Sequence, residues 1–208
     1  MPTLSANHRR GQMSGHKSVT GLSELYTVIV GLALALGVGS VVGSEGPAPE
    51  LPNVLIGIAV VVTLIPFYHG GLRHLRETYS DDAVVKPFLI LWDFLLLFVE
   101  ACILLAAASS LHSTQRVGIL LVALWLVDVV WVAGARLLGQ QPPVEWAFSN
   151  VVAVIAVALL LLAPRVVDVD GAAQAALLLI ISVLRTVADY YLSRGFYFPA
   201  DELGQSPA

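Results

Sequence analysis

Charged and amide side chains interrupt several long apolar runs of this sequence. They are Asp93, Glu100, Asp128, Asn150, Arg185 and Asp189. A charged side chain at the centre of a bilayer costs roughly 2.5–3.5 kcal/mol, so five facing lipid would cost on the order of 10–15 kcal/mol. We therefore expect these side chains to face the interior of a helix bundle. There, carboxylates can bind a cation or carry a proton, and the guanidinium can serve as counter-ion.

The depth of these residues in their apolar runs suggests that most of them share one layer. With a rise of about 1.5 Å per residue, all except Glu100 fall in the same half of the membrane. Glu100 is nearer the middle, but it follows Asp93 by two helical turns and so lies on the same helix face. One hypothesis is a polar vestibule that binds a cation, a proton or a small polar ligand. The other is a buried ion-pair network that fixes helix packing.

Arg185 and Asp189 are spaced to pair within one helix. Asp93 or Asp128 could compete for the same guanidinium. Polar residues at the ends of the first two apolar runs are expected to form the rim of the vestibule: Glu24, Tyr26, Tyr68, His69 and Arg73.

The second apolar run contains Pro66 and closes on Gly70 and Gly71. This pattern predicts a second span that closes near His69, where the glycine pair either ends the helix or lets backbones approach closely. A short amphipathic extension over residues 72–76 is expected to follow along the interface. The basic residues of that extension are either snorkelling cations or a collar for anionic lipid headgroups.

Composition indicates which elements must position these residues. The chain has 208 residues, of which 57% are hydrophobic and 12% charged, and its mean hydropathy is +0.82. These values exclude a disordered chain and a nucleic-acid binder, and they predict an all-α integral membrane protein. Six spans are expected in a single bundle, at about 22–42, 51–69, 86–108, 117–138, 146–163 and 172–192. They form one domain over 21–194, between a polar cytoplasmic tail at 1–20, expected to be disordered, and a short cytoplasmic tail at 195–208.

The distribution of basic residues predicts the orientation. With six spans, one side carries eight of them: Arg9, Arg10, Lys17, Arg73, Arg76, Lys86, Arg136 and Arg194. The other side carries Arg116 and Arg165. The positive-inside rule then places both termini in the cytoplasm. Composition and the absence of a glycosylation sequon favour the plasma membrane of a bacterium.

Motif searches indicate no known catalytic or cofactor chemistry. The sequence has no Gly-x-Ser-x-Gly, His-Glu-x-x-His, phosphate-binding or dinucleotide-binding pattern. His69 and His74 are five apart, which is off the spacing that places two metal ligands on one helix face. The single cysteine, Cys102, excludes an intramolecular disulfide and is expected to be a small buried residue. We expect no metal, no cofactor and no enzymatic activity.

Two functional hypotheses follow. The first is a small transporter or channel-like protein with a cation- or proton-handling vestibule. The second is a non-catalytic anchor, sensor or accessory subunit with a protein partner, whose buried charges serve packing and assembly. Ala35, Gly39 and Gly43 form a small-residue stripe on the first span, which predicts close packing either within the bundle or against a second copy.

Overall fold

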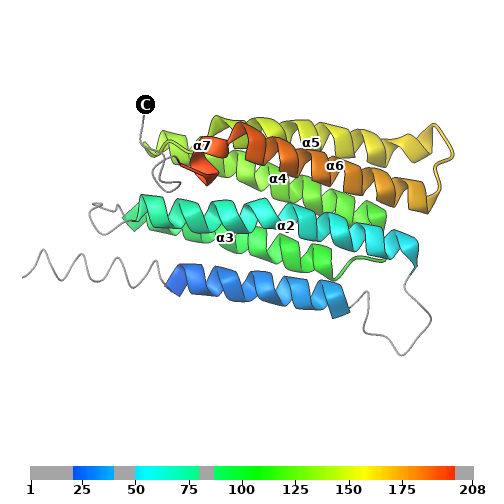
Figure 1. The fold of residues 1–208 in the computed structure, drawn as a ribbon, viewed down its shortest axis with the longest axis horizontal. Coiled ribbons are helices and arrows are strands. Elements are labelled where there is room, and N and C mark those ends of the chain that lie inside the picture. Colours follow the sequence, from blue (N-terminus) through cyan, green and yellow to red (C-terminus); the bar gives the residue numbers. More distant parts are fainter. Residues whose placement is uncertain (1–20, 40–49, 80–86, 200–208) are drawn as a thin grey trace, which may run out of the picture.

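The computed structural model describes residues 21–39, 50–79 and 87–199. Within these ranges the chain is helical, and six helices are long and apolar enough to cross a membrane. The expectation of an all-α bundle of six membrane-spanning helices is thus confirmed. The helices lie side by side along one common axis (Figure 1).

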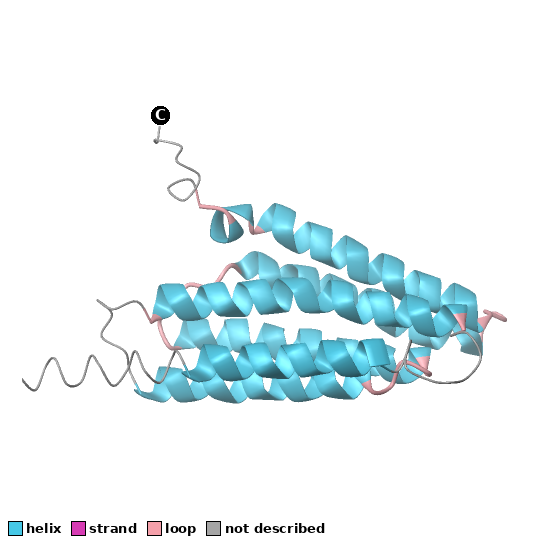
Figure 2. Cartoon of the chain, turned by 60° about the horizontal axis from the view of Figure 1, so that its bottom comes forward, coloured by secondary structure: helices cyan, strands magenta, loops and turns pink. Residues whose placement is uncertain are grey.

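The helix bounds are as follows. An N-terminal helix covers Gly21–Gly39. It is followed by α2 (Leu51–Thr78), α3 (Pro87–Ala108), α4 (Thr114–Leu137), α5 (Val144–Leu162) and α6 (Gly171–Leu192). A short 3-10 turn, Ala163–Arg165, extends α5, and a four-residue helix, α7 (Arg194–Tyr197), follows α6. Figure 2 shows that loops connect the helices only at the two ends of the bundle.

Local signals in the sequence explain several helix ends. Ser113 caps α4 by accepting a hydrogen bond from the Arg116 backbone N–H. Asp170 caps α6 more fully, because its Oδ1 accepts from the N–H groups of Ala172 and Ala173 at 2.7 and 2.9 Å. Gly139 has a φ of 90° just after α4, a conformation that glycine adopts without steric cost.

The second span is longer than the sequence pattern predicted. Instead of ending near His69, α2 continues through Gly70 and Gly71 to Thr78, so residues 72–76 are part of the same helix and not a separate extension. Pro66 lies inside α2 and has no N–H to offer the carbonyl of Val62, one turn earlier. The Thr186 hydroxyl on α6 donates to that carbonyl at 3.1 Å and replaces the missing bond.

Five helices enclose the interior. Helix α6 packs between α2 and α5, α4 packs between α5 and α3, and α3 also contacts α2. The N-terminal helix lies outside this ring, against α2 and α3: Tyr26 stacks on Tyr68, and Gly37 approaches Ala108. At the α3–α4 contact the ring of Trp92 lies directly over Gly134, where only a glycine leaves space for it.

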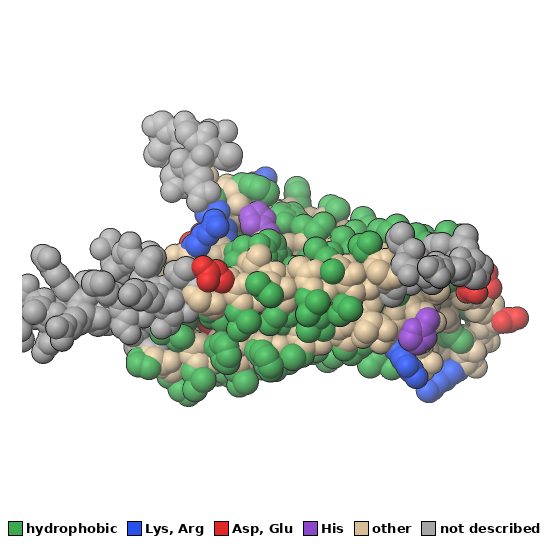
Figure 3. Space-filling view, turned by 90° about the horizontal axis from the view of Figure 1, so that it is seen from below, with side chains coloured by type: hydrophobic (Ala, Val, Ile, Leu, Met, Phe, Trp, Pro, Cys, Tyr) green, Lys and Arg blue, Asp and Glu red, His purple; other side chains and the backbone are tan. Residues whose placement is uncertain are grey.

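The outer surface of the bundle is apolar and its ends are charged. Large apolar side chains such as Phe98, Phe148 and Leu184 are exposed along the sides, and Figure 3 shows charged side chains near the two ends. This arrangement suits a bilayer, and the chain is a multi-pass membrane protein. Cys102 is exposed on the outside, so the expectation that it is buried was wrong.

The two ends of the bundle can be named by their arginines. Helices α2, α4 and α6 finish at the Arg194 end, where Arg73, Arg76 and Arg136 also lie. The opposite, Arg165 end carries Arg116 and Arg165. The N-terminal helix, drawn in blue, begins at the Arg194 end, where α7 also lies (Figure 1).

Candidate functional site

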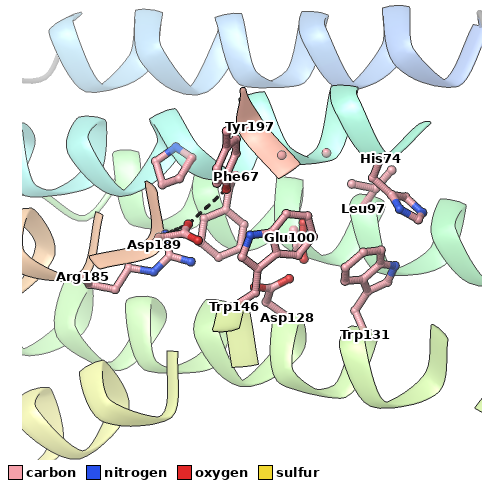
Figure 4. Close-up of a pocket in the computed structure, with 13 residues that line it drawn as sticks. Phe67, His74, Leu97, Glu100, Asp128, Trp131, Trp146, Arg185, Asp189 and Tyr197 are labelled. Atoms are coloured by element: carbon pink, nitrogen blue, oxygen red, sulfur yellow. Dashed lines mark hydrogen bonds and ion pairs between the residues drawn. The ribbon is translucent and has the colours of Figure 1, made fainter. Parts of the chain in front are cut away.

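A cavity of about 40 Å³ lies among α2, α3, α4, α5 and α6, with α7 on one side. Its polar lining residues are His74, Glu100, Asp128, Arg185, Asp189 and Tyr197. Figure 4 shows Glu100 and Asp128 in the middle, Arg185 and Asp189 to one side, and His74 and Trp131 to the other. The volume has room for roughly three water-sized molecules. Each of the five helices therefore contributes a wall to one small polar site.

A chain of polar contacts centred on Arg185 ties three helices together. The Arg185 Nε–H donates to Asn150 Oδ1 at 2.8 Å, and its Nη1 lies 3.2 Å from Asp189 Oδ2. Its guanidinium carbon also lies 4.9 Å from the centre of the Phe67 ring. The Asn150 amide N–H in turn donates to Asp128 Oδ2. The predicted pairing of Arg185 with Asp189 is present, and Asn150 links this pair to Asp128.

Asp93 forms a separate cluster towards the Arg194 end. Its carboxylate accepts hydrogen bonds from the Tyr79 hydroxyl at 2.7 Å and from the Trp131 Nε1–H at 2.9 Å. The His74 Nε2 lies 3.0 Å away, and the Thr78 hydroxyl lies 3.2 Å from the other ring nitrogen of His74. Because an ionised carboxylate can only accept, the hydrogen bond between His74 Nε2 and Asp93 places a proton on Nε2, and His74 donates to the carboxylate.

These contacts separate Asp93 from the layer that the sequence suggested. Asp93 is 0% exposed, does not line the cavity, and makes no contact with Arg185. The hypothesis that it competes for the guanidinium was wrong, because three other donors occupy its oxygens. Burial and the hydrogen bond to Asp93 raise the pKa of Tyr79 above its ordinary value of 10.0. The neutral hydroxyl is therefore favoured as a donor.

Glu100 differs from the other buried acids. It lines the cavity and is 5% exposed, yet within the part of the chain that the structure describes its carboxyl group makes no hydrogen bond or ion pair. The Nε1–H of Trp146, also on the cavity wall, has no hydrogen-bond partner among the described residues. Two buried polar groups on opposite helices thus remain available to a ligand in the cavity.

None of the five expected rim residues lines the cavity. Glu24 is exposed on the N-terminal helix, which lies outside the ring of five. Tyr26 is buried but faces Tyr68, with ring centres 6.2 Å apart. His69 Nδ1 lies 3.0 Å from the Tyr190 hydroxyl. Arg73 pairs with Glu77 on the next turn of α2, at 2.7 Å.

Helix α7 contributes a site residue that the sequence pattern did not reveal. Tyr197 was assigned to the short C-terminal tail, but it is 2% exposed, and its hydroxyl donates to Asp189 Oδ2 at 3.2 Å. Its ring packs 4.4 Å from that of Tyr190, and Arg73 donates to its backbone carbonyl at 3.3 Å. Burial, reinforced by the charge of Asp189, raises the pKa of the Tyr197 hydroxyl above its ordinary value. The run of aromatic residues after α6 was the available signal.

Gly70 makes room for this tyrosine. A Cβ atom at Gly70 would lie 3.2 Å from the Tyr197 hydroxyl oxygen and 3.4 Å from the Trp146 ring. The glycine pair of α2 therefore serves close packing around the cavity. It does not end the helix.

The small-residue stripe of the first span faces outwards where the structure describes it. Ala35 and Gly39 are exposed on the N-terminal helix, so these two residues do not pack within the bundle, and Gly43 lies outside the described residues.

Metal coordination and relatives give no further indication of chemistry. Among residues 21–39, 50–79 and 87–199, no group of three or more His, Cys, Asp and Glu side chains is placed to hold a metal ion. Comparison with protein-family models, curated proteins and solved structures finds no match for this chain.

Proposed function

We propose that this chain is a small transporter or channel-like protein, with no enzymatic reaction, whose cavity handles a cation or a proton. The observation that carries the proposal is Glu100, a buried carboxyl group that lines the cavity and has no partner among the described residues. Three acidic side chains line the cavity, whereas Arg185 is its one arginine among the described residues. Without a further positive charge, the cavity would hold uncompensated carboxylates in a medium of low dielectric constant.

Helix packing alone does not account for Glu100. The Asp93 carboxylate accepts hydrogen bonds from His74, Tyr79 and Trp131, so it can contribute to stability. Glu100 has no such contacts, and a carboxylate buried without a partner opposes folding by several kcal/mol. Ionisable residues of this kind within a membrane typically mark an ion or proton pathway.

Charge distribution supports an orientation for this site. We place the Arg194 end, and with it both termini, in the cytoplasm of a bacterial cell, with the bundle in the plasma membrane. Arg73, Arg76, Arg136 and Arg194 lie at that end, and Arg116 and Arg165 at the other. The cavity then lies closer to the cytoplasm than to the outside.

Flux measurements in liposomes test the proposal. Purified protein is reconstituted with a pH or cation gradient, and the rate of ion movement is compared among wild type, Glu100→Gln and Asp128→Asn. We expect at least a tenfold loss in both variants. Glu145→Gln is the matched control, because Glu145 is an exposed acid in the first turn of α5, and it should keep the wild-type rate. Equal rates in all four proteins would contradict the proposal.

A second function is favoured by the polar clusters that tie helices together. If the chain is an anchor, sensor or accessory subunit, the Arg185 chain and the Asp93 cluster serve assembly alone. Ala35 and Gly39 then offer an exposed surface for a second copy or another membrane protein. This alternative predicts that wild type moves no ion, that Asp128→Asn lowers the folded yield, and that a partner remains bound in mild detergent.

A further inference from the structure

The size of the cavity limits the ion that it can hold. About 40 Å³ accommodates roughly three water-sized molecules. A metal cation that enters with its full hydration shell of about six waters needs more space. One that enters without the shell needs protein oxygens in its place, as the rings of carbonyl oxygens in potassium channels illustrate. The available ligands therefore decide between a metal cation and a proton.

Few oxygen atoms in the cavity are available to a metal cation. Asp128 Oδ2 accepts from Asn150, and Asp189 Oδ2 faces both Arg185 and Tyr197. Asp189 Oδ1 has no hydrogen-bond partner among the described residues, so with Asp128 Oδ1 and the two Glu100 oxygens the three acids offer at most four free oxygen atoms. Much of the remaining wall is aromatic or aliphatic, formed by Phe67, Leu97, Trp131 and Trp146. The guanidinium of Arg185 also repels a metal ion at this position. The cavity thus lacks the six or more oxygen ligands that hard cations typically take.

A proton needs only one acceptor oxygen, and Glu100 supplies it. Resting on the function proposed above, we infer that the ion is the proton, carried on the Glu100 carboxyl group with Asp128 as the adjacent acid. A hydronium ion transfers its proton to the carboxylate and leaves as water. The carboxylic acid later returns the proton to water on the other side of the membrane. A neutral Glu100 also removes one of the uncompensated charges of the cavity.

The groups around Glu100 come from every neighbouring element. They are Asp128 on α4, Arg185 and Asp189 on α6, His74 on α2, Trp146 on α5, Tyr197 on α7 and Tyr26 on the N-terminal helix. Arg185 is paired with Asp189, and His74 with Asp93. Glu100 and Asp128 lie close together in the cavity (Figure 4), and neither forms an ion pair with a cation of the described residues.

A layer of buried polar atoms continues beyond the cavity towards the Arg165 end. Thr63, Trp125 and Ser182 are each 0% exposed, and their side-chain hydroxyl or N–H groups have no hydrogen-bond partner among the described residues. Each lies one helical turn before a cavity residue, on α2, α4 and α6 respectively, which is about 4.5 Å along the axis. Hydroxyl groups at this depth can pass a proton onwards from Glu100, whereas they offer a metal ion few ligands.

Infrared spectroscopy of the protein in lipid tests the site without measuring transport. At pH 7 we expect a carboxylic acid carbonyl band that shifts in D₂O, is lost in Glu100→Gln and persists in Glu145→Gln. Addition of Na⁺ or K⁺ should leave the band unchanged. Persistence of the full band in Glu100→Gln, or its loss when either cation is added to wild type, would overturn the inference.

Flux in proteoliposomes then separates this inference from the proposed function. With an internal pH dye, acidification should proceed at the same rate, within twofold, when Na⁺ and K⁺ are replaced by N-methylglucamine. Movement of Na⁺ or K⁺ without acidification would overturn the proton inference and leave the proposed transport role in place. If no ion moves but the Glu100 band is present, the transport role fails, and the assignment of a proton to Glu100 stands.

Discussion

Replacing Asp93 with asparagine should destabilise the bundle strongly. The carboxylate accepts from Tyr79, His74 and Trp131 at 2.7, 3.0 and 2.9 Å, and it is completely buried. Asparagine has one acceptor oxygen. Placed at the Oδ2 position, that oxygen still serves Tyr79 and His74, but its NH₂ group then meets the Trp131 N–H, donor against donor.

The expected cost follows from these contacts. Two charge-assisted bonds become neutral ones, a loss of about 1 kcal/mol each, and a buried donor loses its partner at about 1–3 kcal/mol. The total is about 3–5 kcal/mol. For a chain of 150–250 residues, this corresponds to a fall in melting temperature of roughly 6–20 °C.

Thermal unfolding in detergent, followed by tryptophan fluorescence, measures this change. Asp170→Asn is the matched control, because Asp170 is an exposed N-cap and asparagine caps a helix equally well. The control should melt within about 2 °C of wild type. Tyr79→Phe should cost about 1–3 kcal/mol alone and less when combined with Asp93→Asn, since the two residues share a bond. An Asp93→Asn protein that melts like wild type would refute the assignment of this cluster to stability.

Three further changes test other parts of the structure. Gly134→Ala places a Cβ against the ring of Trp92, so overpacking of about 1–3 kcal/mol should outweigh the roughly 1 kcal/mol gain in helix propensity and lower the melting temperature. Gly171→Ala, with no atom within 4 Å of the added Cβ, should not lower it. Because burial raises the pKa of Tyr79, its neutral form stabilises the fold below about pH 10 and this contribution is lost as pH rises further; the alkaline fall in melting temperature should be smaller in Tyr79→Phe. Removal of the ring in Tyr197→Ala should increase acrylamide quenching of tryptophan fluorescence, and Tyr197→Phe should leave it unchanged; equal quenching in both would show that α7 does not shield the cavity.

Hydropathy and charge cost were sufficient to predict the fold and much of the candidate site. Six apolar runs predict six spans, and the penalty for exposing charge to lipid predicts that Glu100, Asp128, Arg185 and Asp189 face inwards. Hydropathy and the cost of exposing charge depend only on whether a residue lies in water or in hydrocarbon. They can therefore be applied to the sequence without knowing which helices are neighbours.

The partners of each buried group depend on helix order and rotation, which one sequence does not specify. Depth alone grouped Asp93 with Arg185. In the structure, however, Trp131 of α4 donates to Asp93, whereas Asp128 of the same helix joins the Arg185 chain through Asn150. Glu24 was assigned to the rim because it borders that polar layer at the start of the first span, but the N-terminal helix packs outside the ring and leaves it exposed. Depth gives only the position of a residue along the membrane normal, whereas a contact also depends on which helices are neighbours and how each is rotated.

Tertiary packing also decides features that short-range sequence patterns left open or did not show. Gly70 and Gly71 were compatible with a helix end or with close packing, and in the structure α2 continues while the Tyr197 and Tyr26 rings pack beside the two glycines. A four-residue helix such as α7 has no periodicity to detect. Its position is set by the contact of Tyr197 with Asp189, across the end of α6.

The bond from Thr186 to the Val62 carbonyl has a consequence for biosynthesis. Pro66 leaves that carbonyl without a helical partner, and in hydrocarbon an unsatisfied backbone group costs several kcal/mol. Its donor lies on α6, the last span, which also brings the Arg185 contact to Asn150. During membrane insertion the Val62 carbonyl and the Asn150 side-chain oxygen therefore lack these hydrogen-bond donors until α6 has been inserted. Closure of the bundle thus depends on α6, and a chain truncated before Gly171 should leave both the Val62 carbonyl and the Asn150 side-chain oxygen without these donors.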